Sequence, residues 1–74
     1  MNTNPKACKA AVDRLAPRPR EVLVLLTHGS PRKEIADLMG ISISTVNTYC
    51  ESIYSKLGVS NVAQAVVIAS KAGL

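Results

Sequence analysis

The sequence predicts an all-α domain of four helices, and three observations support this fold class. Apolar residues recur at spacings of three and four along several segments, as they do on the buried face of a helix. Glycines stand where these segments end, at Gly29, Gly40, Gly58 and Gly73, and glycine commonly follows the last turn of a helix. No segment alternates apolar and polar residues as a half-buried strand would, so the sequence offers no candidate strand.

The first helix is expected to follow an N-terminal tail. Residues 1–14 begin with Asn and Pro residues and show only a short alanine-rich patch, so they are interpreted as a flexible tail or linker with at most a frayed helical turn. The folded domain is expected over residues 15–74. Pro17 and Pro19 suit the first turn of a helix, where a missing N–H costs nothing, and this helix is expected to run to about His28.

The second and third helices are expected to form a helix-turn-helix. Ser30 suits a cap and Pro31 a first-turn position, and the second helix is expected to end at Gly40. The third helix is expected to be capped by Ser42 and closed by Gly58. Two helices joined by about three residues that include a glycine cross at a steep angle, which is the arrangement of that motif. A fourth helix follows, with Asn61 and Gln64 as a variant capping box.

The composition describes a small basic domain with an aliphatic core. Phe and Trp are absent, and 74 residues are enough for one compact domain. The formal net charge of +4 favours an acidic partner, and nucleic acid is the commonest one for such a domain. No apolar run approaches the roughly 20 residues that cross a bilayer, and no export signal is seen, so a soluble cytoplasmic protein without membrane contact is expected.

The sequence offers no catalytic residue, metal site or cofactor site. Cys8 and Cys50 lie far apart with only His28 for company, so neither a zinc site nor a redox motif can be built from them. No glycine-rich phosphate loop and no carboxylate pair at useful spacing occurs, and His28 suits the end of a helix, where positive charge is favourable. We therefore expect no enzyme and no cofactor.

The third helix has two faces of opposite character. The residues expected to face inward are Val46, either Tyr49 or Cys50, Ile53 and Leu57. Those expected to face outward are Ser44, Asn47, Thr48, Glu51 and Ser55. Short polar side chains suit a helix that enters the major groove, where Asn can pair with adenine, a Thr methyl can meet a thymine methyl and a carboxylate can accept from cytosine. We predict base contacts by Asn47 and Thr48, with Ser44 and Glu51 secondary; a plain solvated face is the alternative.

Positive charges and free N–H groups surround this helix. The residues expected to contact DNA phosphates are Arg18, Arg20, Arg32, Lys33, Ser42, Thr45 and Lys56. Arg32 and Lys33 stand in the first turn of a helix, where cations oppose the helix dipole, so a binding role is favoured over simple solubility. The free N–H groups near Ser42, Ser44 and Thr45 can add an uncharged phosphate contact.

Several separated motifs together resemble one family, the LuxR-type helix-turn-helix domain, also called the NarL/FixJ or GerE type. They are Leu15-Ala-Pro-Arg-Pro-Arg-Glu-Val-Leu23, Lys33-Glu-Ile-Ala36, Ile41-Ser42, Thr45-Val46, Lys56-Leu-Gly-Val59 and Gln64-Ala-Val66. The resemblance covers Leu15 to Leu74. It implies a four-helix domain of a bacterial regulator whose third helix enters the major groove, often attached to a receiver or ligand-binding domain. Glu51 stands where the family often has a cation, which predicts reduced affinity.

The fourth helix is expected to form a homodimer. Between Val62 and Ala69 the only strongly polar residue is Gln64, so this helix is apolar nearly all round, whereas a surface helix of a monomer shows one polar side. By family resemblance Ala65, Val66 and Ala69 turn inward. The residues left for the dimer interface are then Val62, Ala63, Val67 and Ser70.

Two alternatives to this function remain open. The helix-turn-helix could bind another regulator or RNA polymerase in place of DNA, which Glu51 and the low charge of the third helix favour and the basic rim disfavours. A region-four-like sigma factor domain shares the motif, but the apolar fourth helix ending in Ala72-Gly73-Leu74 fits the LuxR type better.

Overall fold

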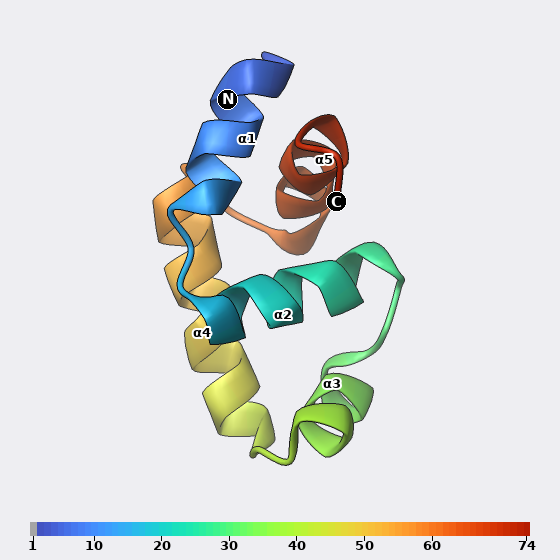
Figure 1. The fold of residues 1–74 in the computed structure, drawn as a ribbon. Coiled ribbons are helices and arrows are strands. Elements are labelled where there is room, and N and C mark those ends of the chain that lie inside the picture. The colour runs from blue at the N-terminus through green and yellow to red at the C-terminus, as the bar shows by residue number, and fades with distance from the viewer. Residues whose placement is uncertain (1) are drawn as a thin grey trace.

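The computed structural model describes residues 2–74 as five α-helices (Figure 1). Their bounds are α1 Pro5–Asp13, α2 Pro17–Thr27, α3 Arg32–Met39, α4 Ile43–Leu57 and α5 Val62–Lys71. No strand occurs in this part of the chain, so the expected all-α class is confirmed, with one helix more than the four expected. None of the helices over residues 2–74 is long and apolar enough to span a membrane.

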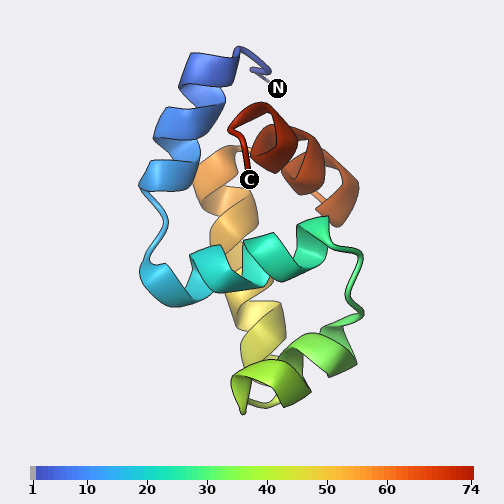
Figure 2. The same cartoon turned by 45° about the vertical axis from the view of Figure 1, so that its right-hand side comes forward.

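The longest helix, α4, organises the others. Helix α2 crosses it near its middle, α3 packs beside its N-terminal end, and α1 and α5 pack beside its C-terminal half (Figures 1 and 2). All five helices contribute buried apolar side chains to one core. Its members are Cys8, Val12, Leu15, Val22, Leu23, Leu26, Ile35, Ala36, Val46, Cys50, Ile53, Leu57, Ala65, Ile68 and Ala69. One face of α4 is therefore covered along its length, and the opposite face is left to solvent.

The segment interpreted as a flexible tail contains a helix, which corrects that interpretation for the described residues; Met1 lies outside them. Asn4 caps α1, because its Oδ1 accepts from the backbone N–H groups of Lys6 at 3.0 Å and Ala7 at 3.3 Å. Cys8 and Val12, four residues apart, are buried on the same face of this helix. Two apolar residues make too short a periodic pattern to be recognised in the sequence, and the helix depends on packing against α4 and α5.

Arg20 fastens α1 to α2. Its Nη2 donates to the carbonyl oxygens of Val12 at 3.4 Å, Asp13 at 3.1 Å and Leu15 at 3.4 Å. These carbonyls lie at the end of α1 or just beyond it, where a helix cannot satisfy its own acceptors. Arg20 was expected at a DNA phosphate, but it is half-buried and its guanidinium caps the end of α1.

The caps of the helix-turn-helix agree with expectation at α4 but not at α3. The N-cap of α3 is Pro31 and no side chain caps this helix, so the cap expected at Ser30 is wrong. Ser42 caps α4 as expected, with its Oγ accepting from the N–H of Thr45 at 3.0 Å. Gly40 ends α3 with φ of +67°, which a side chain would oppose, and Ala36 is buried as expected at the contact between the two helices.

The capping box of α5 is confirmed in a shifted form. Asn61 accepts from the N–H of Gln64 at 2.9 Å, as a capping residue should. The Gln64 side chain returns to the N–H of Ser60 at 2.8 Å, one residue earlier than in the usual box. Helix α5 therefore begins at a fixed point after the turn that ends α4.

Candidate nucleic-acid interface

The outward face of α4 carries the side chains that the sequence analysis assigned to base contacts. The buried stripe consists of Val46, Cys50, Ile53 and Leu57, so the choice between Tyr49 and Cys50 is settled for Cys50, and Tyr49 is half-buried. On the other side Ser44, Thr48, Glu51 and Ser55 are exposed, and Asn47 is half-buried at the edge of this face. The expected division of the helix into two faces is confirmed.

Several hydroxyl groups on this face already have a partner in the chain. The Thr48 hydroxyl donates to the Ser44 carbonyl at 3.2 Å, and the residue is exposed, which leaves its methyl group as the free part of the side chain. The hydroxyls of Ser42 and Thr45 hydrogen-bond each other at 2.9 Å in the first turn. Thr48 therefore presents an apolar methyl group, and the start of α4 presents first-turn N–H groups that a helix cannot satisfy internally.

Arg32 and Asn47, which the sequence assigned separately to phosphate and base, are in contact with each other. Arg32 lies at the start of α3 and donates through Nη1 to the Oδ1 of Asn47. Through Nη2 it donates to the hydroxyl oxygen of Tyr54 at 3.1 Å. Asn47 and Tyr54 are seven residues, or about two helical turns, apart on α4. Their side chains meet at the same guanidinium, which links α3 to α4.

The five basic residues assigned to phosphate differ in whether their charged groups already have hydrogen-bond or ion-pair partners within the chain. Arg18 is exposed but engaged, with Nη1 on Glu21 at 2.8 Å and Nη2 on the Met39 carbonyl at 3.1 Å. Arg20 and Arg32 make the internal contacts described above. Lys33 and Lys56 are exposed and have no hydrogen-bond or ion-pair partner among residues 2–74. Of the five, only these two lysines have ammonium groups that can contact an outside partner without breaking an interaction within the described residues.

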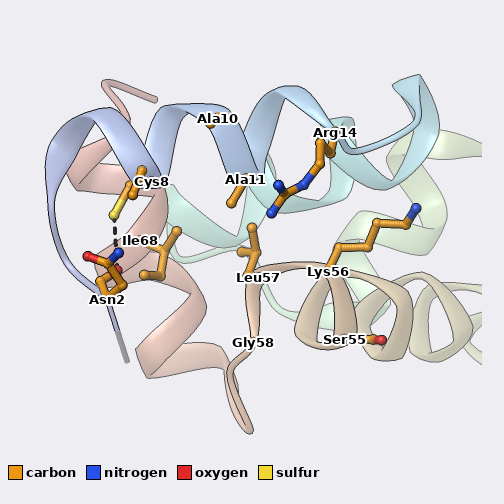
Figure 3. Close-up of a pocket in the computed structure, with 11 residues that line it drawn as sticks. Asn2, Cys8, Ala10, Ala11, Arg14, Ser55, Lys56, Leu57, Gly58 and Ile68 are labelled. Carbon is orange, nitrogen blue, oxygen red and sulfur yellow. Dashed lines mark hydrogen bonds between the residues drawn. The ribbon is translucent and has the colours of Figure 1, made fainter.

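A groove of about 380 Å³ between α1 and the C-terminal end of α4 adds a cation that the sequence analysis did not assign. Arg14 and Lys56 line it from opposite sides, over an apolar floor that includes Leu57 and Ile68 (Figure 3). No acidic residue lines this groove, and Arg14 has no side-chain hydrogen bond or ion pair within the described part of the chain. Arg14 was missed because its placement depends on α1, which the sequence analysis did not predict.

The two cysteines are buried free thiols. Burial raises the pKa of the Cys50 thiol above its ordinary value, more than the nearby Arg32 lowers it, so this thiol is protonated at neutral pH. Burial likewise raises the pKa of Tyr54. Within residues 2–74 no cluster of His, Cys, Asp and Glu could hold a metal ion.

Helix α5 leaves part of its apolar surface uncovered. Ala65, Ile68 and Ala69 are buried, whereas Val66, which was expected inside, is half-buried. Of the four residues assigned to a dimer interface, Ala63, Val67 and Ser70 are exposed and Val62 is half-buried. These four residues share the outer side of the helix and are mostly small.

A second exposed apolar surface lies between α2 and α3. Leu38 is 64% exposed and borders a groove of about 320 Å³ together with Val24, Leu25 and Met39, with Glu21 at its rim. A single exposed leucine is common on a protein surface. Leu38, however, is surrounded by other apolar side chains, and such a continuous apolar patch is less common. No pattern in the sequence had indicated this surface.

Comparison with known proteins relates this chain to one family. Residues 13–69 match the family model described as bacterial regulatory proteins, luxR family. The chain is 41% identical over 59 residues to the transcriptional regulatory protein LiaR of Bacillus subtilis, covering 80% of this chain and 28% of that protein. It is 39% identical over 51 residues to the transcriptional regulatory protein MctR of Rhizobium johnstonii, covering 69% and 24%.

A third relative is the response regulator protein VraR of Staphylococcus aureus, 40% identical over 57 residues, with 77% of this chain and 27% of that protein covered. The chain thus spans about a quarter to a third of the length of the curated relatives it matches. No solved structure matches it.

Proposed function

Because this chain belongs to the LuxR family of bacterial regulatory proteins, whose members are DNA-binding transcription regulators, we propose that it reads DNA sequence by placing α4 in the major groove. The observation that carries this proposal is the outward face of α4. Its side chains are mostly short and polar, and all but the half-buried Asn47 are exposed. Two cations without a partner among residues 2–74, Lys33 at the start of α3 and Lys56 in the last turn of α4, accompany it. An α-helix fits the major groove, and short polar groups can reach base edges there.

Phosphate contacts are proposed on both sides of α4. Lys33 at the start of α3 and the first-turn N–H groups of α4 that Ser42 does not cap, those of Ile43 and Ser44, would meet one strand. In a helix-turn-helix the N-terminal residues of the recognition helix contact the bases, so its C-terminal end leaves the groove over the backbone. We therefore add Arg14 to Lys56 as contacts to the phosphates at that end, because both face one groove that has no acid.

Binding is tested by fluorescence anisotropy with labelled duplex DNA at two salt concentrations. The proposal expects measurable binding to random DNA that weakens steeply with salt, and tighter binding to a site selected from a random library. Asn47→Ala should cost about 1–3 kcal/mol on the selected site and little on random DNA, because base contacts specify and phosphate contacts do not. Equal loss on both DNAs would refute base reading by this residue.

We propose that the chain binds as a homodimer through α5. The exposed Val67 and its neighbours would allow close approach of two copies about a two-fold axis, which places two α4 helices on successive major-groove faces. Such an interface is too small to be permanent, so weak association strengthened by DNA is expected. Val67→Lys should keep the helical content and abolish cooperative occupation of a two-half-site duplex; surviving cooperativity would place the interface elsewhere.

The likeness to longer regulators supports two further elements of the proposal. We propose that in a longer chain this domain is controlled by a receiver or ligand-binding domain, and that it acts without catalysis in the bacterial cytoplasm, where the DNA is.

A second candidate function, binding another transcription protein in place of DNA, is favoured by one observation, the apolar surface around Leu38. No binding to any duplex at low salt would leave this candidate as the better one.

A further inference from the structure

We propose that Arg32 is a positioning residue that makes Asn47 act mainly as a donor toward DNA, so that Asn47 selects guanine in preference to adenine. This inference rests on the proposed function, because it concerns what α4 reads. Its basis is the contact between the Nη1 of Arg32 and the Oδ1 of Asn47. It differs from the adenine pairing that an asparagine on a recognition helix suggests from sequence alone.

The chemistry of the guanidinium fixes which way the Asn47 amide faces. Arg carries five N–H donors and no acceptor, so only the carbonyl oxygen of Asn47 can face it. The NH₂ group must then point to the other side of the amide. Asn47 lies at the edge of the outward face of α4, half-buried, with Arg32 on its α3 side. The group left for a DNA base is the NH₂, with two donors.

Arg32 is itself held in place, which gives the amide a fixed orientation. Its other arm donates to the Tyr54 hydroxyl at 3.1 Å, so the planar guanidinium is anchored at two points on α4. Neither anchor is an acid, and no ion pair of Arg32 occurs in residues 2–74. The positive charge is therefore not neutralised, and it polarises the amide so that the NH₂ becomes a stronger donor.

The base preference follows from the groups that each base shows in the major groove. Pairing with adenine needs the amide oxygen to accept from N6 while the NH₂ donates to N7. Arg32 already donates to that oxygen, and the guanidinium charge makes the oxygen a weaker acceptor for N6 through its remaining lone pair. Guanine shows two acceptors, N7 and O6, and no donor, so it matches an amide whose NH₂ is the stronger group.

The experiment is selection of binding sites from a randomised duplex by the 74-residue chain and its variants, with binding to random DNA measured alongside. The position read by Asn47 is the one whose preference Asn47→Ala removes. We expect guanine over adenine there by about tenfold, the discrimination of one good base contact. In Arg32→Met the amide is free to turn, so the preference should fall below about threefold or shift to adenine, while Arg32→Lys, which keeps a donor, should retain part of it.

Two further variants separate the possible outcomes. Asn47→Asp keeps an acceptor for Arg32 but has no NH₂, so it should lose the guanine preference and keep the fold, which tests the idea even if Arg32→Met does not fold. Arg18→Met, which removes an engaged cation on α2, should leave the preference unchanged. The inference would be overturned, with DNA binding intact, by an adenine preference in the unmodified chain. It would also be overturned by a guanine preference that survives Arg32→Met or Asn47→Asp. If the chain binds no duplex at all, both the proposed function and the inference are wrong.

Discussion

The salt dependence of DNA binding should distinguish the free cations of this chain from those that hold its fold together. Lys33→Ala is the most informative change, because Lys33 is exposed, unpartnered among the described residues, and stands at the start of α3 next to Arg32, whose side chain contacts α4. Arg20→Met is the matched contrast. Both residues were expected at phosphates from the sequence, but the Arg20 guanidinium donates to three carbonyls of the chain itself.

The magnitude follows from the number of free cations that are proposed to contact phosphates. Each phosphate contact contributes about 0.9 to the slope of log K against log salt, so Arg14, Lys33 and Lys56 together give a slope of about −2.7 per domain. Between 50 and 200 mM salt, affinity should then fall about fortyfold. Lys33→Ala leaves two contacts and a slope of about −1.8, which corresponds to a fall of about twelvefold. Arg20→Met should keep the original slope.

The assay is anisotropy of a labelled random duplex across this salt range, at a temperature where circular dichroism shows each variant folded. Lys56→Ala and Arg14→Ala should each behave like Lys33→Ala. The reasoning would be refuted if Arg20→Met flattens the slope by about one contact while Lys33→Ala does not. In that case the guanidinium leaves the end of α1 to reach DNA.

Three other predictions concern single groups. Arg20→Met should lower stability by about 2 kcal/mol, the scale of hydrogen bonds to a charged group, and the melting temperature by roughly 10 °C in a circular-dichroism melt; an unchanged melt would mean that α1 docks without it. Glu51→Gln should tighten binding to random DNA at low salt, because it removes a negative charge from the exposed face of α4; no change would place this carboxylate away from phosphate. Burial raises the pKa of the Cys50 thiol, so the unfolded chain ionises first and stability should fall as pH rises past the thiol's ordinary value of 9.0. Urea titrations at pH 7 and pH 10 should show a smaller loss in Cys50→Val than in the unmodified chain, and equal losses would contradict this origin.

The four helices from α2 to α5 could be predicted from the sequence because local signals mark them. Ser42 and Asn61 are residues that cap helices, and they do so here. Gly40 and Gly58 end the two helices of the motif with positive φ, as the positions of these glycines indicated. The burial of Cys50 and the exposure of Thr48 follow from helical spacing alone.

The features that could not be predicted depend on contacts between distant parts of the chain. Helix α1 has only two buried apolar residues of its own, and its docking requires α4, α5 and the side chain of Arg20. Long side chains such as Arg32 reach partners fifteen or more residues away, and spacing along one helix does not reveal them. Sequence reasoning could therefore propose residues for the interface but could not show which of them contact each other.

The central claim is that the outward face of α4 reads the major groove, and nuclear magnetic resonance of the labelled chain with its selected duplex tests it most directly. The account predicts contacts from the Thr48 methyl and the Asn47 side-chain NH₂ to major-groove base protons, with the largest shift changes along α4 and at the start of α3. Shift changes confined to α5 or to the surface around Leu38, with the signals of α4 unmoved, would contradict it.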